Sequence, residues 1–506
     1  MFQVSSLVEL FLAAVFLKIF HKFFYAWKHV LPFPPGPPPR FLVGNSRDLP
    51  QKQPWLTYTE WGRRYGELVH ASALGHHIVI VNSVKTANEL FEKRSHVYSD
   101  RPVITMIELM GWGFNVGLMP MSDRWRQHRR MFQQHFRRDI ARTYRPIQTE
   151  KIHQLLQQLL SDPQNFREHL KTLTAAIIMR TVYGYDVKPN NDRFVDLSER
   201  AVKKLSDSFF PGAAVVNAFP ILRYLPSWFP GAGFQAYAAD CRLMIEEMQQ
   251  VPFNFAKQNM LNGVDAKPVV AKMLQVRGRT DEVAIREAAA TAYAAGSDTT
   301  VSALASFFLA MAQYPAVQER AQKEIDSVIG SARLPQFEDR PSLPFVEALY
   351  REVMRWRPAL PLGVSHATST EDIYNGFYIP KGATVMANAW AMTRDETVYP
   401  DPERFNPDRF FTADGKLNDD DTILTFGFGR RICVGRHNAE ATVWFTIVSV
   451  LATFKISKAK DAAGNEIEIN AVYSDGMVSH PRPFPCSITP RSVAAQGLVI
   501  SAVEDL

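Results

Sequence analysis

Residues 426–435 read FGFGRRICVG and place one cysteine between glycines and arginines, directly before an apolar run that favours a helix. Gly429 and Gly435 lack side chains and would let the backbone approach a flat ring system closely. Arg431 can pair with a carboxylate, and Cys433 precedes a helix N-terminus, whose peptide dipoles favour negative charge on sulfur. These residues predict a cysteine thiolate that ligates haem iron, and such a donor favours O–O bond cleavage.

The spacing F-x-x-G-x-R-x-C-x-G, which begins at Phe426, resembles the cysteine-ligand loop of the cytochrome P-450 superfamily of haem-thiolate monooxygenases. The resemblance implies heme b, iron protoporphyrin IX, with the cysteine as the metal ligand and Phe426, Gly429, Arg431 and Gly435 around the cofactor. Val434 departs from the proline that many members carry at this position. A cysteine considered alone is more often a small buried apolar residue, so the interpretation depends on motifs elsewhere in the chain.

Residues 281–314 are rich in alanine, carry acidic residues at their start and end at a proline, which predicts one long helix. Inside it the run AGSDTT, residues 295–300, resembles the oxygen-binding motif of the same superfamily. Gly296, followed by hydroxyls that can bond back to the preceding turn, would weaken the helix locally and open a groove. The resemblance implies that Thr299 positions a proton at the oxygen site and that Asp298 connects it to solvent.

Glu352 and Arg355 are three residues apart, so they share one face of a predicted helix and can pair. A buried pair needs a third group for its remaining donors and acceptors, and Arg404, in the PERF run at 402–405, is the candidate. E-x-x-R followed by P-E-R-F resembles the superfamily's buried triad, which supports the cysteine loop and does no chemistry. An isolated E-x-x-R is usually a surface ion pair of little energetic value.

Trp125 and Arg129 are four residues apart on another predicted helix, and both can donate hydrogen bonds to a carboxylate. The W-x-x-x-R pair resembles the superfamily's propionate-binding pair, which implies that role here. Without that context the segment would be an ordinary basic, solvated helix. His366 occupies a position where related chains often place a propionate-binding histidine or arginine, although Ala367 replaces the usual neighbouring arginine.

The coarse secondary structure is mainly helical with a small β region. Residues 68–83 alternate apolar and polar side chains around a glycine, residues 372–379 contain an Asn-Gly turn, and residues 383–388 fit another strand. This mixture matches the superfamily's fold, a helical prism enclosing haem. Length alone, 506 residues, would suggest about three domains. The four motifs occur in the superfamily's order, so we expect one haem-thiolate monooxygenase domain over residues 41–506.

Residues 1–28 are predicted to form an N-terminal membrane anchor. Residues 4–20 are mostly apolar but shorter than the ~20 residues of a membrane span, and the aromatic run at 23–27 extends them. Lysines follow this segment and none precede it, so the large domain should face the cytoplasm. A cleaved signal peptide is the rival interpretation, but no small-residue cleavage site precedes the prolines. Residues 29–40 are then a stiff proline-rich linker, and the expected location is the endoplasmic reticulum membrane, crossed once.

The net charge of +6 and the pI near 9.0 come partly from clustered arginines. Several lie within residues 124–138, and Arg430 and Arg436 flank the ligand loop, so basic surface should lie on the cysteine side of the haem. An acidic flavoprotein, NADPH-cytochrome reductase, would be steered there as electron donor. We expect no nucleic-acid partner because no recognition motif accompanies the basic residues. Three cysteines make a poor disulfide framework, which fits a reducing compartment.

The segments that line the substrate pocket in relatives are overwhelmingly apolar in this chain and offer few charges to anchor an ionic substrate. They are residues 106–121 with Trp112 and Phe114, Phe209 and Phe210, Ala292 and Ala295, residues 360–364, and Met477 and Val478. Other segments look like fungal members of secondary metabolism, so a terpenoid, polyketide or indole-type intermediate is the expected apolar substrate, with O2 as co-substrate. The alternatives are a haem-thiolate isomerase, dehydratase or peroxygenase, and a non-catalytic haem sensor.

Overall fold

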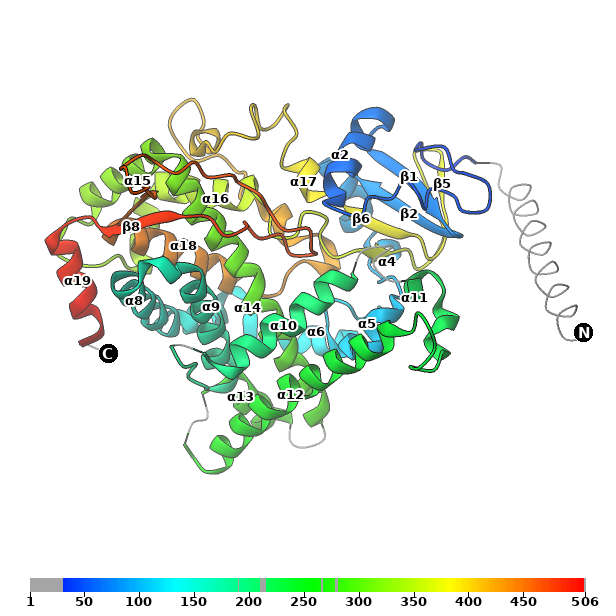
Figure 1. Ribbon diagram of the computed structural model, residues 1–506, viewed down its shortest axis with the longest axis horizontal. Helices are drawn as coiled ribbons and strands as arrows, with labels where there is room; N and C mark the ends of the chain where they lie inside the picture. Colours follow the sequence, from blue (N-terminus) through cyan, green and yellow to red (C-terminus); the bar gives the residue numbers. More distant parts are fainter. Residues whose placement is uncertain (1–30, 190, 210–214, 265–266, 278–280, 505–506) are drawn as a thin grey trace, which may run out of the picture.

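The computed structural model describes residues 31–189, 191–209, 215–264, 267–277 and 281–504. Helices form the broad body of the molecule, and the four-stranded sheet lies at one end of it (Figure 1). The C-terminal helix α19 (Val493–Glu504) lies at the opposite end. The expectation of a mainly helical fold with a small β region is confirmed.

The helices that build the body share buried apolar faces, which pack against one another. They are α5 (Thr105–Leu109), α6 (Asp123–Phe136), α8 (Arg145–Ser161), α9 (Phe166–Tyr183), α10 (Arg193–Ser208), α11 (Val215–Ala218), α12 (Gly233–Leu261), α13 (Val269–Arg277), α14 (Glu282–Gln313), α15 (Pro315–Val328), α16 (Pro344–Trp356) and α18 (Arg436–Thr453). Three shorter helices accompany the sheet: α2 (Pro54–Tyr65), α4 (Ser95–Tyr98) and α17 (Ala389–Met392).

The sheet has the order β1-β2-β6-β3, and two separate two-stranded sheets, β4-β5 and β7-β8, are also present among the described residues. The predicted Asn-Gly hairpin is confirmed, and the alternating residues on either side of Gly75 form a second hairpin. Each turn has two residues with positive φ, Leu74 and Gly75 in one and Asn375 and Gly376 in the other. The third predicted strand is also present, as β6. The strands are β1 (Leu68–Ala73), β2 (His76–Val81), β3 (His366–Ala367), β4 (Asp372–Tyr374), β5 (Phe377–Ile379), β6 (Thr384–Ala387), β7 (Phe454–Lys458) and β8 (Cys486–Pro490).

Helix α14 runs through the middle of the helical body, and most of its side chains are buried (Figure 1). It ends at Gln313, with Tyr314 as the C-cap directly before Pro315, so the long helix expected over 281–314 is confirmed. The expected groove at Gly296 is not formed by a break, because the helix is continuous through this residue. A Cβ added at Gly296 would lie 3.1 Å from the Ile178 side chain. The glycine therefore lets α9 approach α14 closely.

The proline-rich segment packs on the sheet. The Pro32 carbonyl accepts a hydrogen bond from the Tyr378 amide (2.8 Å), and the Pro35 carbonyl accepts one from the His70 amide (2.9 Å). The predicted anchor at 1–28 and the first two linker residues lie outside the described residues. Among the residues that the structure describes, no single helix is both long and apolar enough to cross a membrane; only the pair α14 and α15, bent by 104°, reaches that composition.

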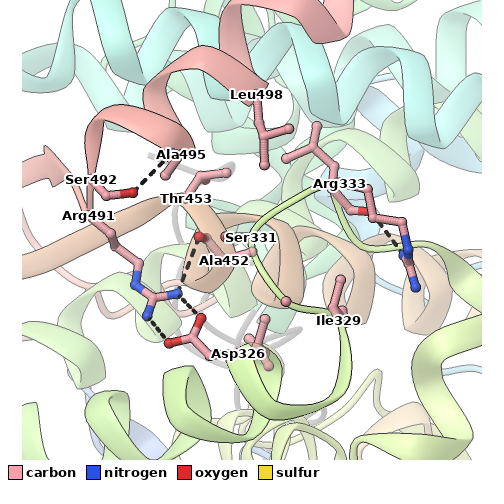
Figure 2. A pocket seen from close by; sticks show the side chains of 13 residues that line it. Asp326, Ile329, Ser331, Arg333, Ala452, Thr453, Arg491, Ser492, Ala495 and Leu498 are labelled. Carbon is pink, nitrogen blue, oxygen red and sulfur yellow. Dashed lines mark hydrogen bonds and ion pairs between the residues drawn. The ribbon is translucent and has the colours of Figure 1, made fainter.

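A pocket of about 270 Å³ lies where α19 meets α15 and the end of α18 (Figure 2). Arg491 forms an ion pair with Asp326 at its edge (2.6 Å), and Leu498 and Ala495 of α19 contribute apolar surface. None of the residues that line this pocket belongs to the motifs singled out in the sequence. We therefore assign it to the packing of the C-terminal helix.

Candidate functional site

Cys433 lies in the loop just before α18, and a backbone hydrogen bond closes this loop. The Cys433 amide donates to the Phe426 carbonyl (2.8 Å). The side chain retains exposed surface, yet burial raises the pKa of its thiol. Together these two observations fit a sulfur that faces an enclosed space.

The thiolate is favoured by its neighbours but not enough to offset burial. Hydrogen bonds from the backbone of Gly435 and Arg436, and the charge of Arg129, all act to lower the Cys433 pKa, whereas desolvation acts more strongly to raise it. The backbone N–H groups at the start of α18 thus favour negative charge on sulfur, as expected, although burial outweighs them. A bound metal ion is the group that deprotonates a coordinating thiol outright.

Two of the three glycines in the loop, Gly429 and Gly435, have different roles. Gly429 has φ +53°, and an added Cβ would lie 2.1 Å from the Phe91 carbonyl oxygen, so this glycine allows the loop to rest on the backbone of residues 88–93. Around Gly435 the nearest atom to such a Cβ is the Cys433 Sγ, at 3.9 Å. Gly435 therefore lies beside the sulfur, whereas Gly429 allows close backbone packing. The close approach of Gly429 to a flat ring stays a prediction.

Arg431 is held between two segments that precede α6. Its guanidinium donates to the carbonyls of Ser99 (2.7 Å) and Met119 (2.9 Å) and lies 4.4 Å from the centre of the Trp125 ring. Burial lowers the Arg431 pKa to about 9, partly offset by Asp100. The side chain is thus a buried cation beside the indole predicted to bind the same propionates.

Arg101 is a second buried arginine in this cluster, and the sequence did not point to it. It donates to the carbonyls of Gly117, Val364 and Ser365, each at 2.7 Å. Burial, followed by the charge of Arg431, lowers the Arg101 pKa well below its ordinary value. Arg101 follows Asp100, whose carboxylate acts on both arginines.

His366 and Arg129 complete the cation cluster. Nδ1–H of His366 donates to the Tyr98 carbonyl (2.7 Å), and burial and Arg101 together lower its pKa well below the ordinary value. Arg129 donates to the Ile432 carbonyl (2.7 Å), which ties α6 to the cysteine loop. Burial lowers the Arg129 pKa to about 10.

These buried basic side chains suit the two propionate carboxylates of a haem. Three arginines and a histidine neighbour one another here, with Arg431 against Trp125 and Arg129 near Cys433, and burial disfavours the charged form of each. An anion placed among them would restore those charges, and haem carries two carboxylates as propionates. The structure thus brings together every predicted propionate residue (Trp125, Arg129, His366, Arg431) and adds Arg101.

The predicted proton-relay residues lie on α14. Thr299 Oγ1 donates to the Ala295 carbonyl one turn earlier (2.9 Å), as the sequence predicted for a hydroxyl in this run. Ala295 is exposed although Tyr293 and Thr300 beside it are buried. Asp298 forms an ion pair with His480 (Oδ1 to Nε2, 3.1 Å), a residue that sequence reasoning did not single out.

The buried triad contains a different third residue from the one predicted. Glu352 and Arg355 are fully buried on α16 and pair at 2.6 Å. The third member is Arg409, whose Nε lies 3.3 Å from Glu352 Oε1, whereas Arg404 is exposed. The choice of Arg404 was wrong because the pattern P-x-R-F recurs at residues 407–410, and only that copy reaches the buried carboxylate.

A mainly helical fold, a cysteine at the start of α18 and a cluster of buried bases beside it define a haem-thiolate protein. Comparison with known proteins supplies the family. The family model for cytochrome P450 matches residues 34–486. Cytochrome P450 monooxygenase 208 of Postia placenta is 42% identical over 478 residues, which cover 94% of this chain and 93% of that protein.

Two further relatives give the same result. Cytochrome P450 monooxygenase 98 of Postia placenta is 40% identical over 483 residues, 93% of each chain. Cytochrome P450 monooxygenase ple1 of Rhodocybe pseudopiperita is 40% identical over 482 residues, 93% of this chain and 92% of that protein. The chain belongs to the cytochrome P450 family. It is a monooxygenase of that family, which uses a cysteine-ligated haem, O2 and a partner reductase.

Proposed function

We propose that this monooxygenase oxidises an apolar small molecule, a secondary-metabolite intermediate such as a terpenoid, a polyketide or an indole, with electrons from NADPH. The observation that carries the proposal is one apolar cluster to which five separate segments of the chain contribute. These segments are the ones expected to line the pocket. Their members in the cluster include Met106, Trp112, Phe114, Phe209, Met477 and Val478, and Ala292, Leu360 and Val364 pack against it.

The chemistry of this cluster limits the substrate class. Trp112 and Phe114 stack with ring centres 5.6 Å apart, which gives a broad aromatic surface. Val434, next to Cys433, also packs against the cluster. An ionic substrate would lose its hydration without a paired charge there, so an apolar molecule is favoured. Phe210, named with Phe209 in the sequence, lies outside the described residues.

The proposal gives each site residue a role. Cys433 ligates the iron; Phe426, Gly429 and Gly435 shape its loop; Trp125, Arg129, His366, Arg431 and Arg101 hold the propionates. When bound, the haem supplies oxygen activation, which its thiolate ligand favours. Thr299 holds a proton at the oxygen site, and Asp298 returns protons to it from solvent.

We further propose that the enzyme is held at the endoplasmic reticulum membrane, with its catalytic domain in the cytoplasm. The anchor proposed for residues 1–28 rests on the sequence. A second support is an apolar surface after α11, at the same end of the molecule as the sheet (Figure 1). There Ile221, Tyr224 and Trp228 have exposed fractions of 72%, 77% and 79%. All three lie within residues 221–228, and exposed apolar patches are typical of membrane or protein contacts.

The electron donor is proposed to be NADPH-cytochrome reductase. Arg126, Arg130, Arg137, Arg138 and Arg430 are exposed, and their segments lie on or beside α6, which Arg129 ties to the cysteine loop. An acidic flavoprotein surface would be steered to this basic face.

Feeding candidate metabolites to a reductase-competent host that expresses the full chain tests the proposal. We expect a product heavier by one oxygen atom, detected by mass spectrometry and absent with the Cys433→Ser variant. Labelling with 18O2 should place the heavy atom in that product. Conversion that proceeds without NADPH would instead support an isomerase, dehydratase or peroxygenase.

A further inference from the structure

A buried carboxylate on α14, Glu287, holds two basic side chains of α6. Its Oε2 lies 2.9 Å from His128 Nε2, and its Oε1 accepts a hydrogen bond from the Arg124 guanidinium (2.6 Å). Glu287 and His128 are 9% and 1% exposed, so water screens these contacts little. The sequence motifs gave neither residue a role.

The surroundings of the His128 ring indicate that it is protonated. Nδ1 lies 2.8 Å from the Arg124 carbonyl oxygen, which can only accept, and Nε2 faces the Glu287 carboxyl group. Burial acts to raise the Glu287 pKa, but hydrogen bonds from His128 and Arg124 outweigh it and hold the pKa below its ordinary value. Because the carboxyl group is ionised, both contacts are hydrogen bonds only if the imidazole carries two N–H groups. The contact between the two helices is thus a charge-assisted one.

The helix geometry links this contact to the predicted propionate residues. Arg124 and His128 are four residues apart and share the face of α6 that meets Glu287. Trp125 and Arg129 each follow one position later. Successive residues of an α-helix point about 100° apart. A rotation of α6 that moves His128 away from Glu287 therefore turns Trp125 and Arg129 by the same angle.

The turn of α14 that carries Glu287 is itself held by other contacts. Thr291 Oγ1 donates to the Glu287 carbonyl (2.9 Å) and accepts from the Val116 amide (3.4 Å). At the start of the same helix, Asp281 Oδ1 accepts from Gln127 Nε2 of α6 (3.3 Å). Glu287 is therefore a fixed point against which α6 can be set.

We propose that His128 is a positioning residue for the haem. Its ion pair with Glu287 sets the rotation of α6, and this rotation presents Trp125 and Arg129 to the propionates. Arg129 also donates to the Ile432 carbonyl (2.7 Å), so α14 holds one face of α6 and the cysteine loop holds another. This inference rests on the propionate roles proposed for Trp125 and Arg129.

Release of haem from the holoenzyme tests the proposal without turnover. His128→Leu removes the ion pair, so we expect haem transfer to apomyoglobin at least about tenfold faster, the lower end of what loss of an outer hydrogen-bond partner costs a metal site. The resonance Raman bands of propionate bending should shift in the ferric protein. His128→Gln keeps an N–H donor for Glu287 and should stay close to wild type in both measurements. Wild-type transfer and bands in His128→Leu would overturn the proposal.

Two further proteins separate a loss of positioning from a loss of stability. The double variant His128→Leu/Glu287→Leu replaces the buried pair by apolar groups, so it should recover stability in denaturant and still lose haem fast. His169→Leu is the matched control, because His169 is 5% exposed and its Nε2 contacts the Asp162 carbonyl (2.8 Å) from α9. It should unfold at a lower denaturant concentration and keep haem as wild type does. Equally fast haem loss in this control, or wild-type haem transfer in the double variant, would overturn the positioning role.

Substitution of the propionate residues separates this inference from the proposed function. Trp125→Phe and Arg129→Gln should speed haem transfer and shift the same Raman bands. If they do so and His128→Leu does not, only this inference falls. If neither of them changes the bands, the propionate roles fall and this inference with them. The reduced carbon monoxide spectrum of each variant shows that it has folded and bound haem.

Discussion

The cysteine loop and the middle of α14 contribute to one site but are built differently. The loop is fixed by buried contacts: Arg129 ties it to α6, and Gly429 seats it on the Phe91 backbone. On α14 the relay residues make few contacts, and Asp298 faces a cleft and pairs with a solvent-accessible histidine. A metal ligand needs a fixed position, whereas a proton carrier must move. The cysteine loop is therefore the rigid part of the site, and the relay residues of α14 are the part that moves.

The largest effect, a loss of stability, is expected from breaking the buried triad that supports the cysteine loop. Arg355→Ala leaves Glu352 buried without its main partner, which typically costs about 3–5 kcal/mol. Denaturant unfolding monitored by haem absorbance should show this loss. Arg404→Ala is the control, because this side chain is exposed, and it should change stability by less than about 0.5 kcal/mol. Equal losses from both variants would contradict the triad that contains Arg409.

A smaller effect is expected from Gly429→Ala. The new Cβ would lie 2.1 Å from the Phe91 carbonyl oxygen at a φ of +53°, so the loop must shift. We expect a loss of about 1–3 kcal/mol in stability and faster transfer of haem to apomyoglobin. Gly427→Ala is the comparison, because its φ of +84° is also unfavourable for a side chain but no atom lies within 4 Å of the added Cβ. Faster haem transfer in Gly429→Ala than in Gly427→Ala would be the effect of the contact with the Phe91 carbonyl.

Substitution of a relay residue on α14 should change the coupling of NADPH oxidation to product formation rather than the stability of the protein. Thr299→Ala should keep NADPH oxidation while product per NADPH falls about tenfold, which corresponds to about 1.4 kcal/mol, and hydrogen peroxide is released. Thr299→Ser keeps the hydroxyl and should restore most of the coupling. Unchanged coupling in the alanine variant would remove Thr299 from the relay.

The smallest effect is expected in the pH dependence of stability, and in how haem changes that dependence. Because burial lowers the His366 pKa in the folded chain, the unfolded chain takes up a proton that the folded haem-free chain does not. Stability of the haem-free chain should therefore fall as pH drops below about 6.5, by at most about 1.4 kcal/mol per pH unit from this residue. His366→Gln should flatten that slope, and so should haem, whose propionates favour the protonated imidazole. Thermal unfolding between pH 7 and pH 5 measures both.

The sequence was sufficient to predict the elements that depend on the spacing of neighbouring residues. The long helix α14 and the Asn-Gly hairpin depend on residues close together in the chain, and both were found as expected. Arg101 and His480 were missed because their roles arise from contacts with segments hundreds of residues away, such as Val364 and Asp298. The two P-x-R-F copies were indistinguishable until the position of buried Glu352 selected Arg409.

The Soret spectrum of the reduced, carbon monoxide-bound protein tests the central claim most directly. If Cys433 ligates the iron, the wild-type protein shows the red-shifted band of a thiolate-ligated haem, and Cys433→Ser loses it although haem still binds through the buried bases. A wild-type spectrum without that band, or a serine variant that retains it, would contradict the account.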